Sequence, residues 1–177
     1  MKKFNNKPNK VYNINDKLIW ESRSVAVNCL VILSLKNNLY ILSEKRGSGS
    51  PDNVGKWCFP CGYLDFDETA TDAAIREVYE ETSLDLYKYV DTSFMLLNNL
   101  NQPWYVDSIP NDSKQNVTLR FATVIRDVIF PDLSDEHSEE NEIDELKWIS
   151  FTDIGNYDWA FRHDEIIKEF ITKYELI

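Results

Sequence analysis

Residues 62–84 read GYLDFDETATDAAIREVYEETSL, and the rest of the chain is organised around them. The stretch begins at a turn glycine after an aromatic, strand-like run. Residues 70–82 contain no Pro or Gly and are rich in Ala, Glu and Arg, which predicts an α-helix. Thr69 is a suitable N-cap, and Asp72 adds a favourable negative charge to the first turn.

The predicted helix carries a concentration of like charge. Glu77, Glu80 and Glu81 stand at positions i, i+3 and i+4 and therefore share one face. Arg76 is the only cation in the stretch, so the three carboxylates repel each other without an alternating lysine. A hard divalent cation, which prefers oxygen ligands, is the natural group to neutralise this face.

The composition indicates what class of protein this is and which classes of partner it can bind. The 177 residues suit one domain with a short arm, and 43% hydrophobic and 13% aromatic residues indicate a globular chain. A net charge of −11 argues against binding to nucleic acid polymers or anionic membranes. A phosphorylated small molecule is compatible with this charge because metal ions can bridge acidic protein and anionic ligand.

No apolar run approaches the ~20 residues that span a bilayer. The first ten residues, MKKFNNKPNK, are basic but lack the apolar core of a signal peptide, so we expect a cytoplasmic protein. We expect residues 1–24 to form an arm that is partly mobile or adds an edge strand, and residues 25–177 to form the domain.

The cysteines invite a second interpretation. Cys58 and Cys61 form a CxxC motif, which could indicate a redox pair or a zinc site. The two histidines lie far along the chain, no second CxxC is present, and the motif is expected at the end of a strand rather than at a helix N-terminus. We therefore favour two small, buried or half-buried thiols.

The remaining pattern alternates strands with two helices, which predicts an α+β layered domain with a mixed sheet. We expect a turn at Asn37–Asn38, a loop over 47–55, a long polar loop over 101–116, an acidic loop over 131–141 and a short helical turn over 151–154. The expected strands are 24–35, 39–45, 56–64, 89–99, 117–128 and 142–149, and the second helix is 163–174.

The central stretch resembles the Nudix box, G-x5-E-x7-R-E-U-x-E-E-x-G-U, in which U is a bulky aliphatic residue. Gly62, Glu68, Leu84 and the charged helix residues all match. Ser83 stands where the family has glycine, a position that often needs a left-handed backbone. This departure bears on loop geometry rather than on chemistry. The Trp-x-Phe-Pro run at 57–60 and Trp148 also agree, so the resemblance covers roughly residues 25–154.

This resemblance implies an α/β/α sandwich with a mixed sheet. It also implies an enzyme that uses Mg²⁺ or Mn²⁺ to hydrolyse a nucleoside diphosphate linked to another group. Metal ions would polarise the phosphoryl oxygens and lower the pKa of bound water. The substrate would be a small nucleotide derivative, such as a nucleoside triphosphate, a nucleotide sugar, ADP-ribose or a dinucleotide.

By similarity, each matching residue acquires an expected role. Glu80 and Glu81 would be direct metal ligands, and Glu77 would hold a second metal or orient the attacking water. The backbone carbonyl of Cys61 would be a further ligand. The resemblance also implies that Gly62, Glu68 and Arg76 support the site without touching substrate.

Many family members take another carboxylate from the loop before the late strand. Glu142 occupies the best position for this metal ligand or base, with Glu139, Glu140 and Asp144 as rivals. An ordinary solvated acidic loop remains an equal alternative. The candidates for substrate binding are Arg46, Arg23 and Trp104, with Lys45, Arg120 and Tyr105 beside them, although each is also consistent with a surface charge or with packing.

The main alternative function is a Nudix-like binding or regulatory module that recognises a nucleotide without hydrolysing it. Such modules usually lose box carboxylates, and this chain retains them, which favours the enzyme. Dimers are common in the family, and the N-terminal arm could contribute to a homodimer.

Overall fold

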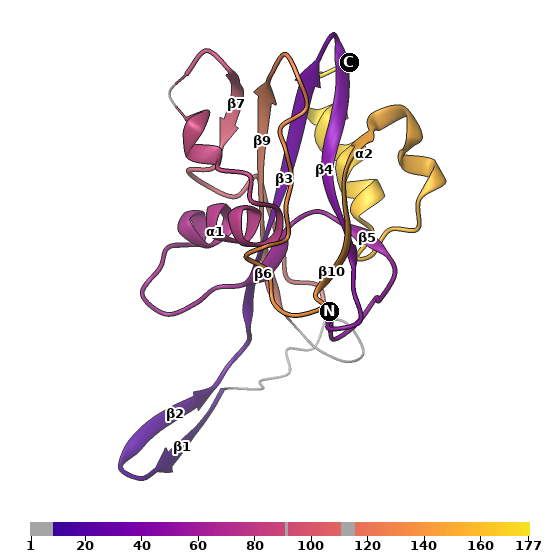
Figure 1. Ribbon diagram of the computed structural model, residues 1–177. Coiled ribbons are helices and arrows are strands. Elements are labelled where there is room, and N and C mark those ends of the chain that lie inside the picture. The colour runs from indigo at the N-terminus through magenta and orange to yellow at the C-terminus, as the bar shows by residue number, and fades with distance from the viewer. Residues whose placement is uncertain (1–8, 91, 111–115) are drawn as a thin grey trace, which may run out of the picture.

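The computed structural model describes residues 9–90, 92–110 and 116–177 and forms a mixed sheet between helices (Figure 1). The strands are β1 Lys10–Ile14, β2 Lys17–Glu21, β3 Val25–Leu35, β4 Asn38–Arg46, β5 Trp57–Cys58, β6 Cys61–Tyr63, β7 Met95–Asn99, β8 Tyr105–Asp107, β9 Val117–Arg126 and β10 Ile143–Ser150. The helices are α1 Ala70–Thr82 and α2 His163–Lys173, with short 3-10 turns η1 Leu86–Lys88 and η2 Phe151–Asn156.

The main sheet has the order β10-β4-β3-β9-β7, and β5, β6 and β8 pair with β4, β3 and β9. β3 and β9 run parallel along Val25↔Val117 to Ser34↔Arg126, whereas the other pairs are antiparallel. The predicted mixed sheet is therefore confirmed.

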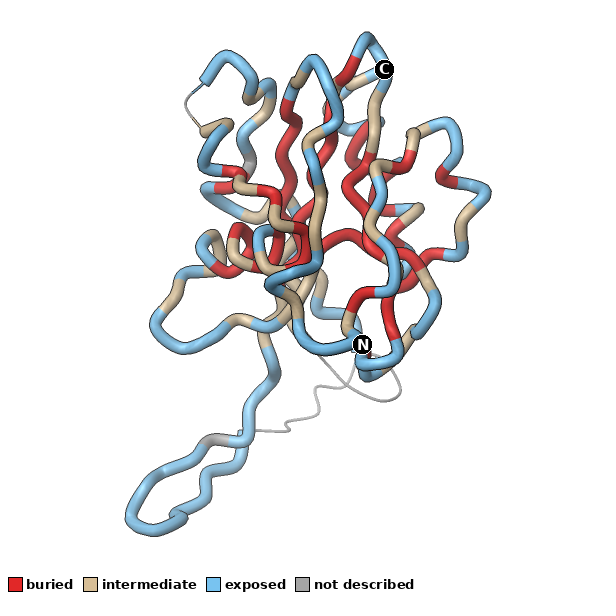
Figure 2. The backbone as a smooth tube through the Cα atoms, viewed as in Figure 1, coloured by how far each residue is buried: buried red, intermediate tan, exposed pale blue. Residues whose placement is uncertain are grey.

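Each face of the sheet buries one helix, because neighbouring residues of β3 point to opposite faces. Cys29 and Val31 pack with α1 residues such as Val78, while Leu30 and Ile32 pack with α2 residues such as Phe170. The buried residues of β3 and of the two helices stand out in Figure 2. Two cores on one sheet make the α/β/α sandwich that the resemblance implies.

The predicted helix over 70–82 is confirmed, with a capping box at its start. The Thr69 side chain accepts from the Asp72 backbone N–H, and the Asp72 side chain accepts from the Thr69 backbone N–H. Ser83 ends the helix in the left-handed conformation, with φ 58° and ψ 11°. The serine thus adopts the backbone that the family glycine usually supplies.

The predicted strand over 56–64 is wrong as a single element. It divides into β5, which pairs with β4, and β6, which pairs with β3. Pro60 stands between the two and has no N–H to donate to a sheet, while its carbonyl accepts from Cys29 N at 3.0 Å. The chain therefore crosses from one strand to the next at this proline, and this crossing forms the floor of the site described below.

Three smaller boundaries also differ from the sequence analysis. The turn after β3 is made by Lys36 and Asn37, both with positive φ, one residue earlier than expected. Residues 89–90 and 92–94 do not belong to a strand, residue 91 lies outside the described part of the chain, and β7 begins at Met95. The long loop contains β8, which pairs with β9.

The N-terminal segment forms a separate two-stranded hairpin of β1 and β2. It extends from the body of the molecule, and the residues of it whose burial is described are exposed (Figures 1 and 2). Its strands pair with each other and not with the eight-stranded sheet. Within the described residues, no helix has both the length and the apolar character needed to cross a membrane.

We predict that replacing Phe170 by alanine destabilises the domain. Phe170 is 0% exposed and packs between α2 and the sheet, with its ring centroid 5.2 Å from that of Trp104. The cavity should lower the free energy of unfolding by about 3–5 kcal/mol in urea denaturation. Glu169→Ala, at the exposed neighbouring position, is the control and should change it by less than about 0.5 kcal/mol. Equal losses in the two variants would contradict the buried role of Phe170.

Candidate active site

Arg76 on α1 forms hydrogen bonds with three acidic side chains of the site. Its guanidinium donates to Glu68 through Nε and Nη2 at 3.0 and 2.9 Å, and to the Tyr63 carbonyl at 3.1 Å. Its Nη1 donates to Glu77 at 2.9 Å and to Glu80 at 2.8 Å. One planar cation therefore ties the loop after β6 to two glutamates of the helix.

Glu77 lies directly beneath Gly62. It is 9% exposed, and a Cβ added at Gly62 would lie 2.1 Å from Glu77 Oε1. Burial raises the pKa of Glu77 to about 7; Arg76 opposes this shift, and the charges of Glu80 and Glu142 add to it. Glycine at position 62 therefore leaves the space that this carboxylate occupies.

Glu81 is the most deeply buried of the helix glutamates, at 2% exposure. Its Oε2 accepts from the backbone N–H of Cys61 at 2.9 Å, so it fixes the start of β6 to the helix. Burial, followed by repulsion from Glu44, raises the pKa of Glu81 well above its ordinary value.

Glu44 on β4 is the residue that sequence analysis missed. It is 2% exposed, and burial followed by the opposing effects of its neighbours leaves its pKa raised to about 7. The available signal was strand alternation: Tyr40 and Leu42 face the α1 core, and the same period places Glu44 on that buried face. An acid at an inward position of a strand is costly to bury unless it is neutralised.

Glu142 stands immediately before β10, and the structure brings it to the same region. Its carbonyl accepts from Gly47 N at 2.6 Å and from Ser50 Oγ at 3.0 Å, which anchors the acidic loop to the loop after β4. Its charge raises the pKa values of both Glu44 and Glu77. Among the rivals, Asp144 pairs with Lys45 at 2.7 Å, and Glu139 and Glu140 are exposed.

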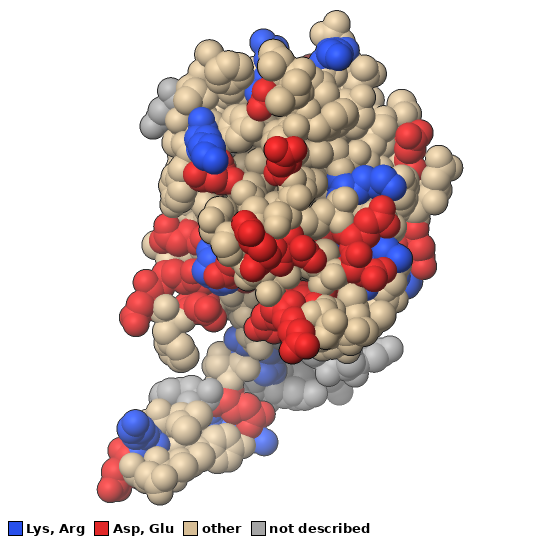
Figure 3. Space-filling model, in the orientation of Figure 1, with Lys and Arg blue, Asp and Glu red and all other residues tan. Residues whose placement is uncertain are grey.

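The site thus combines several carboxylates with little positive charge. Figure 3 shows acidic side chains gathered across this face, over α1 and the neighbouring part of β10. The pKa values of Glu44, Glu77 and Glu81 are all raised, so each is costly to ionise where it lies. Hard oxygen donors that repel each other are the donor set that a divalent cation such as Mg²⁺ or Mn²⁺ would fit.

Comparison with known proteins identifies the family. The family model for the NUDIX domain matches residues 22–170. The chain belongs to the Nudix family.

Solved Nudix structures share the fold at low sequence identity. The NUDIX domain of Shewanella oneidensis NrtR, complexed with ADP ribose, is 15% identical, with a TM-score of 0.64 over 86% of this chain and 89% of that chain. A Caenorhabditis elegans Ap4A hydrolase is 16% identical, with a TM-score of 0.64 over 87% and 99%. A Francisella tularensis NMN adenylyltransferase/ADP ribose pyrophosphatase, complexed with AMP and an Mn ion, is 24% identical, with a TM-score of 0.61 over 86% and 42%. At these identities, the likeness concerns the fold alone.

The candidate substrate residues of this Nudix protein are spread over its surface and interior. Arg46 is buried, donates to the Asp52 carbonyl at 2.9 Å and lies 5.2 Å from the Phe161 ring centre. Trp104 packs against Phe170, which matches the packing alternative. Arg23 is exposed between β2 and β3, and a role for any of the three in substrate binding stays a prediction.

Two further candidates, Arg120 on β9 and Tyr105 on β8, contact each other. Arg120 forms an ion pair with Asp107 at 2.6 Å and lies 4.7 Å from the ring centre of Tyr105.

We predict that Gly62→Ala weakens divalent cation binding with little loss of stability. The new Cβ must displace the Glu77 carboxylate, which is the end of a flexible side chain, so the fold can accommodate it. Mn²⁺ affinity, measured by titration calorimetry, should fall at least about tenfold. Gly155→Ala is the matched control because a Cβ there meets nothing within 4 Å. Unchanged affinity in Gly62→Ala would contradict this arrangement.

We also predict a pH dependence of stability in the metal-free protein. The pKa of Glu44 is about 7 in the folded state against an ordinary 4.5, so the folded chain binds this proton more tightly than the unfolded chain. The stabilisation is complete below about pH 4.5 and is lost as the pH rises to about 7. Glu44→Gln stays neutral and should lack this loss, which amounts to at most about 3 kcal/mol. Urea unfolding in chelator between these pH values measures it, and parallel profiles for the two proteins would refute it.

Proposed function

We propose that this protein is a Mg²⁺- or Mn²⁺-dependent Nudix hydrolase that cleaves a pyrophosphate bond in a nucleoside diphosphate derivative. The observation that carries the proposal is the arrangement of the three box glutamates. Glu77 and Glu80 are held by Arg76, and Glu81 is held by the backbone of Cys61. A binding module has no need to retain this acidic set, in which Glu77 and Glu81 are buried and costly to maintain without a cation.

In this proposal, Glu77, Glu80, Glu81 and the carbonyl of Cys61 hold the cation. When bound, the cation supplies neutralisation of the pyrophosphate charge and activation of water. These groups come from the start of β6 and from α1. Arg76 and Glu68 hold the loop between the two elements in place by paired hydrogen bonds.

We assign proton acceptance from the attacking water to Glu142 or Glu77. Both carboxylates are candidates because the charge of Glu142 acts on Glu77 and adds to the burial that raises the pKa of Glu77 in the metal-free protein. Glu142 comes from the loop before β10, a segment separate from the helix that carries Glu77.

The proposed substrate class is supported by the family and by the nucleotides named with similar structures, such as ADP ribose and Ap4A. We propose a nucleoside triphosphate, a nucleotide sugar, ADP-ribose or a dinucleotide. A screen of these compounds with Mg²⁺ and then Mn²⁺, with both products identified, tests the proposal. Release of inorganic pyrophosphate indicates a triphosphate substrate, and release of two monophosphates indicates a linked diphosphate.

We predict that Glu81→Gln lowers turnover by at least about 100-fold, the scale typical of losing one electrostatic contributor to a transition state. The amide is isosteric and neutral, as the protonated carboxyl would be, so the fold should persist. Glu169→Gln on the exposed side of α2 is the control and should retain full activity. Near-normal turnover of Glu81→Gln would exclude the metal-site assignment.

Tight binding of a nucleotide without hydrolysis by the intact protein would favour the regulatory module instead. The cytoplasmic location and the homodimer expected from the sequence stay predictions, and the mass of the full chain in solution tests the homodimer.

A further inference from the structure

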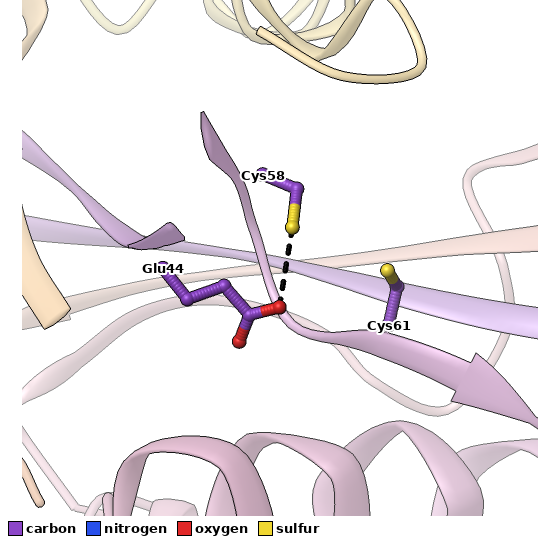
Figure 4. A group of neighbouring side chains, drawn as sticks. All are labelled: Glu44, Cys58 and Cys61. Carbon is purple, nitrogen blue, oxygen red and sulfur yellow. Dashed lines mark hydrogen bonds between the residues drawn. The ribbon is translucent and has the colours of Figure 1, made fainter. Parts of the chain in front are cut away.

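Two thiols and one carboxyl group from three different strands lie close together next to the box glutamates. The side chains of Glu44 on β4, Cys58 on β5 and Cys61 on β6 each offer a ligand atom, and these atoms lie within 4.8 Å of one another. Figure 4 shows the Glu44 carboxyl facing the Cys58 sulfur, with Cys61 beside them on the next strand. The proposed hydrolysis uses only the backbone of Cys61 and neither sulfur.

The strand pairing creates this cluster. Glu44 is the direct cross-strand partner of Cys58, so their side chains share one face of the sheet. The chain then crosses at Pro60 and places Cys61 at the start of β6, which pairs with β3. A CxxC motif alone offers only two donors, and the third donor arrives from fourteen residues earlier in the chain.

One carboxyl oxygen of Glu44 has no hydrogen-bond donor beside it in the described part of the chain. Its Oε1 accepts from the Cys58 thiol at 3.1 Å, but its Oε2 has no hydrogen-bond partner within the described part of the chain. The residue is 2% exposed, so water does not readily satisfy this oxygen. A buried acceptor without a partner is costly, and this oxygen can be satisfied either by a proton shared with the neighbouring Glu81 carboxyl or by a cation bound in the cluster.

We propose that Glu44, Cys58 and Cys61 form a site for one thiophilic divalent cation such as Zn²⁺, beside the oxygen site of the box glutamates and distinct from it by its two sulfur donors. Zinc binds thiolate sulfur at ≈ 2.3 Å and carboxylate oxygen at about 2.0–2.2 Å. Tetrahedral donors therefore lie roughly 3.3–3.8 Å apart. The 3.1 Å between Cys58 Sγ and Glu44 Oε1 is already near this range, and the remaining separations need only small side-chain movements.

The charges of the site balance when the cation binds. Both thiols release their protons to solvent, which leaves two thiolates and one carboxylate. The divalent cation offsets two of these charges. Arg46 supplies one more positive charge: burial acts to lower its pKa, but the charges of Cys58 and Cys61 outweigh this and raise it. Three protein donors leave one position of a tetrahedral shell for water.

The site also has a route for entry. Cys58 is buried, but Cys61 is partly exposed beside the carboxylates of α1. A cation at this position would join β4, β5 and β6 under the box. The inference does not depend on hydrolysis, because it concerns side chains that the reaction does not use.

Titration of the reduced, metal-free full chain with Cd²⁺ or Co²⁺ tests the proposal. Excess Mg²⁺ occupies the oxygen site, and a non-thiol reductant keeps both cysteines reduced. We expect thiolate-to-metal charge-transfer absorption that saturates at one equivalent, with Zn²⁺ in competition abolishing it. A protein that gives no such absorption, or gives it only from exposed adventitious binding at many equivalents, would overturn the proposal.

Variants assign the ligands. Cys58→Ser and Cys61→Ser should each reduce the absorption to half or less, and Glu44→Gln should weaken the affinity at least about tenfold. Cys29→Ser is the matched control, because Cys29 is a buried free cysteine outside the cluster, and it should bind as the unaltered protein does.

Thermal unfolding shows whether each variant is folded. If Cys58→Ser is unstable, Cys61→Ser still tests the site, because Cys61 is partly exposed and its replacement should disturb the fold less. Full absorption in both cysteine variants, full affinity in Glu44→Gln, or loss of binding in Cys29→Ser would each overturn the assignment.

Discussion

The guanidinium of Arg76 is the interaction on which the rest of the site depends. It contacts the loop after β6, the Tyr63 carbonyl and two glutamates of α1 at once. A point charge could not satisfy these acceptors simultaneously, whereas a planar fork of donors can. Without it, the carboxylates of α1 would repel each other and the loop after β6 would not be tied to the helix.

Burial then decides how the acids behave. Glu44, Glu77 and Glu81 lie between α1 and the sheet, and desolvation is the first cause of the raised pKa of each. Their ionisation is therefore coupled to whatever positive charge the site receives. The same crowding explains why glycine suits position 62, since a side chain there would displace the Glu77 carboxylate from its place in the site.

Local patterns predicted the elements well, and pairing between strands produced most of the errors. The helix over 70–82 followed from its composition and its cap, and the structure has the same bounds. The strand over 56–64 was wrong because its two halves hydrogen-bond to different partners, which a run of apolar residues does not reveal. The turn after β3 was misplaced by one residue because two-residue turns depend on register as well as on the asparagine.

The sequence by itself determined the family, the helix and the order of its acidic residues, because these are encoded in short-range spacing along one helix and its flanks. Only the tertiary structure decided that Glu44 lies beside Glu81 and that its carboxyl also lies beside Cys58 and Cys61. The physical reason is that such neighbours arise from the registration of β4 against β5 and from the crossing at Pro60. Contacts between strands depend on hydrogen-bond pairing over long sequence separations, which no local pattern specifies.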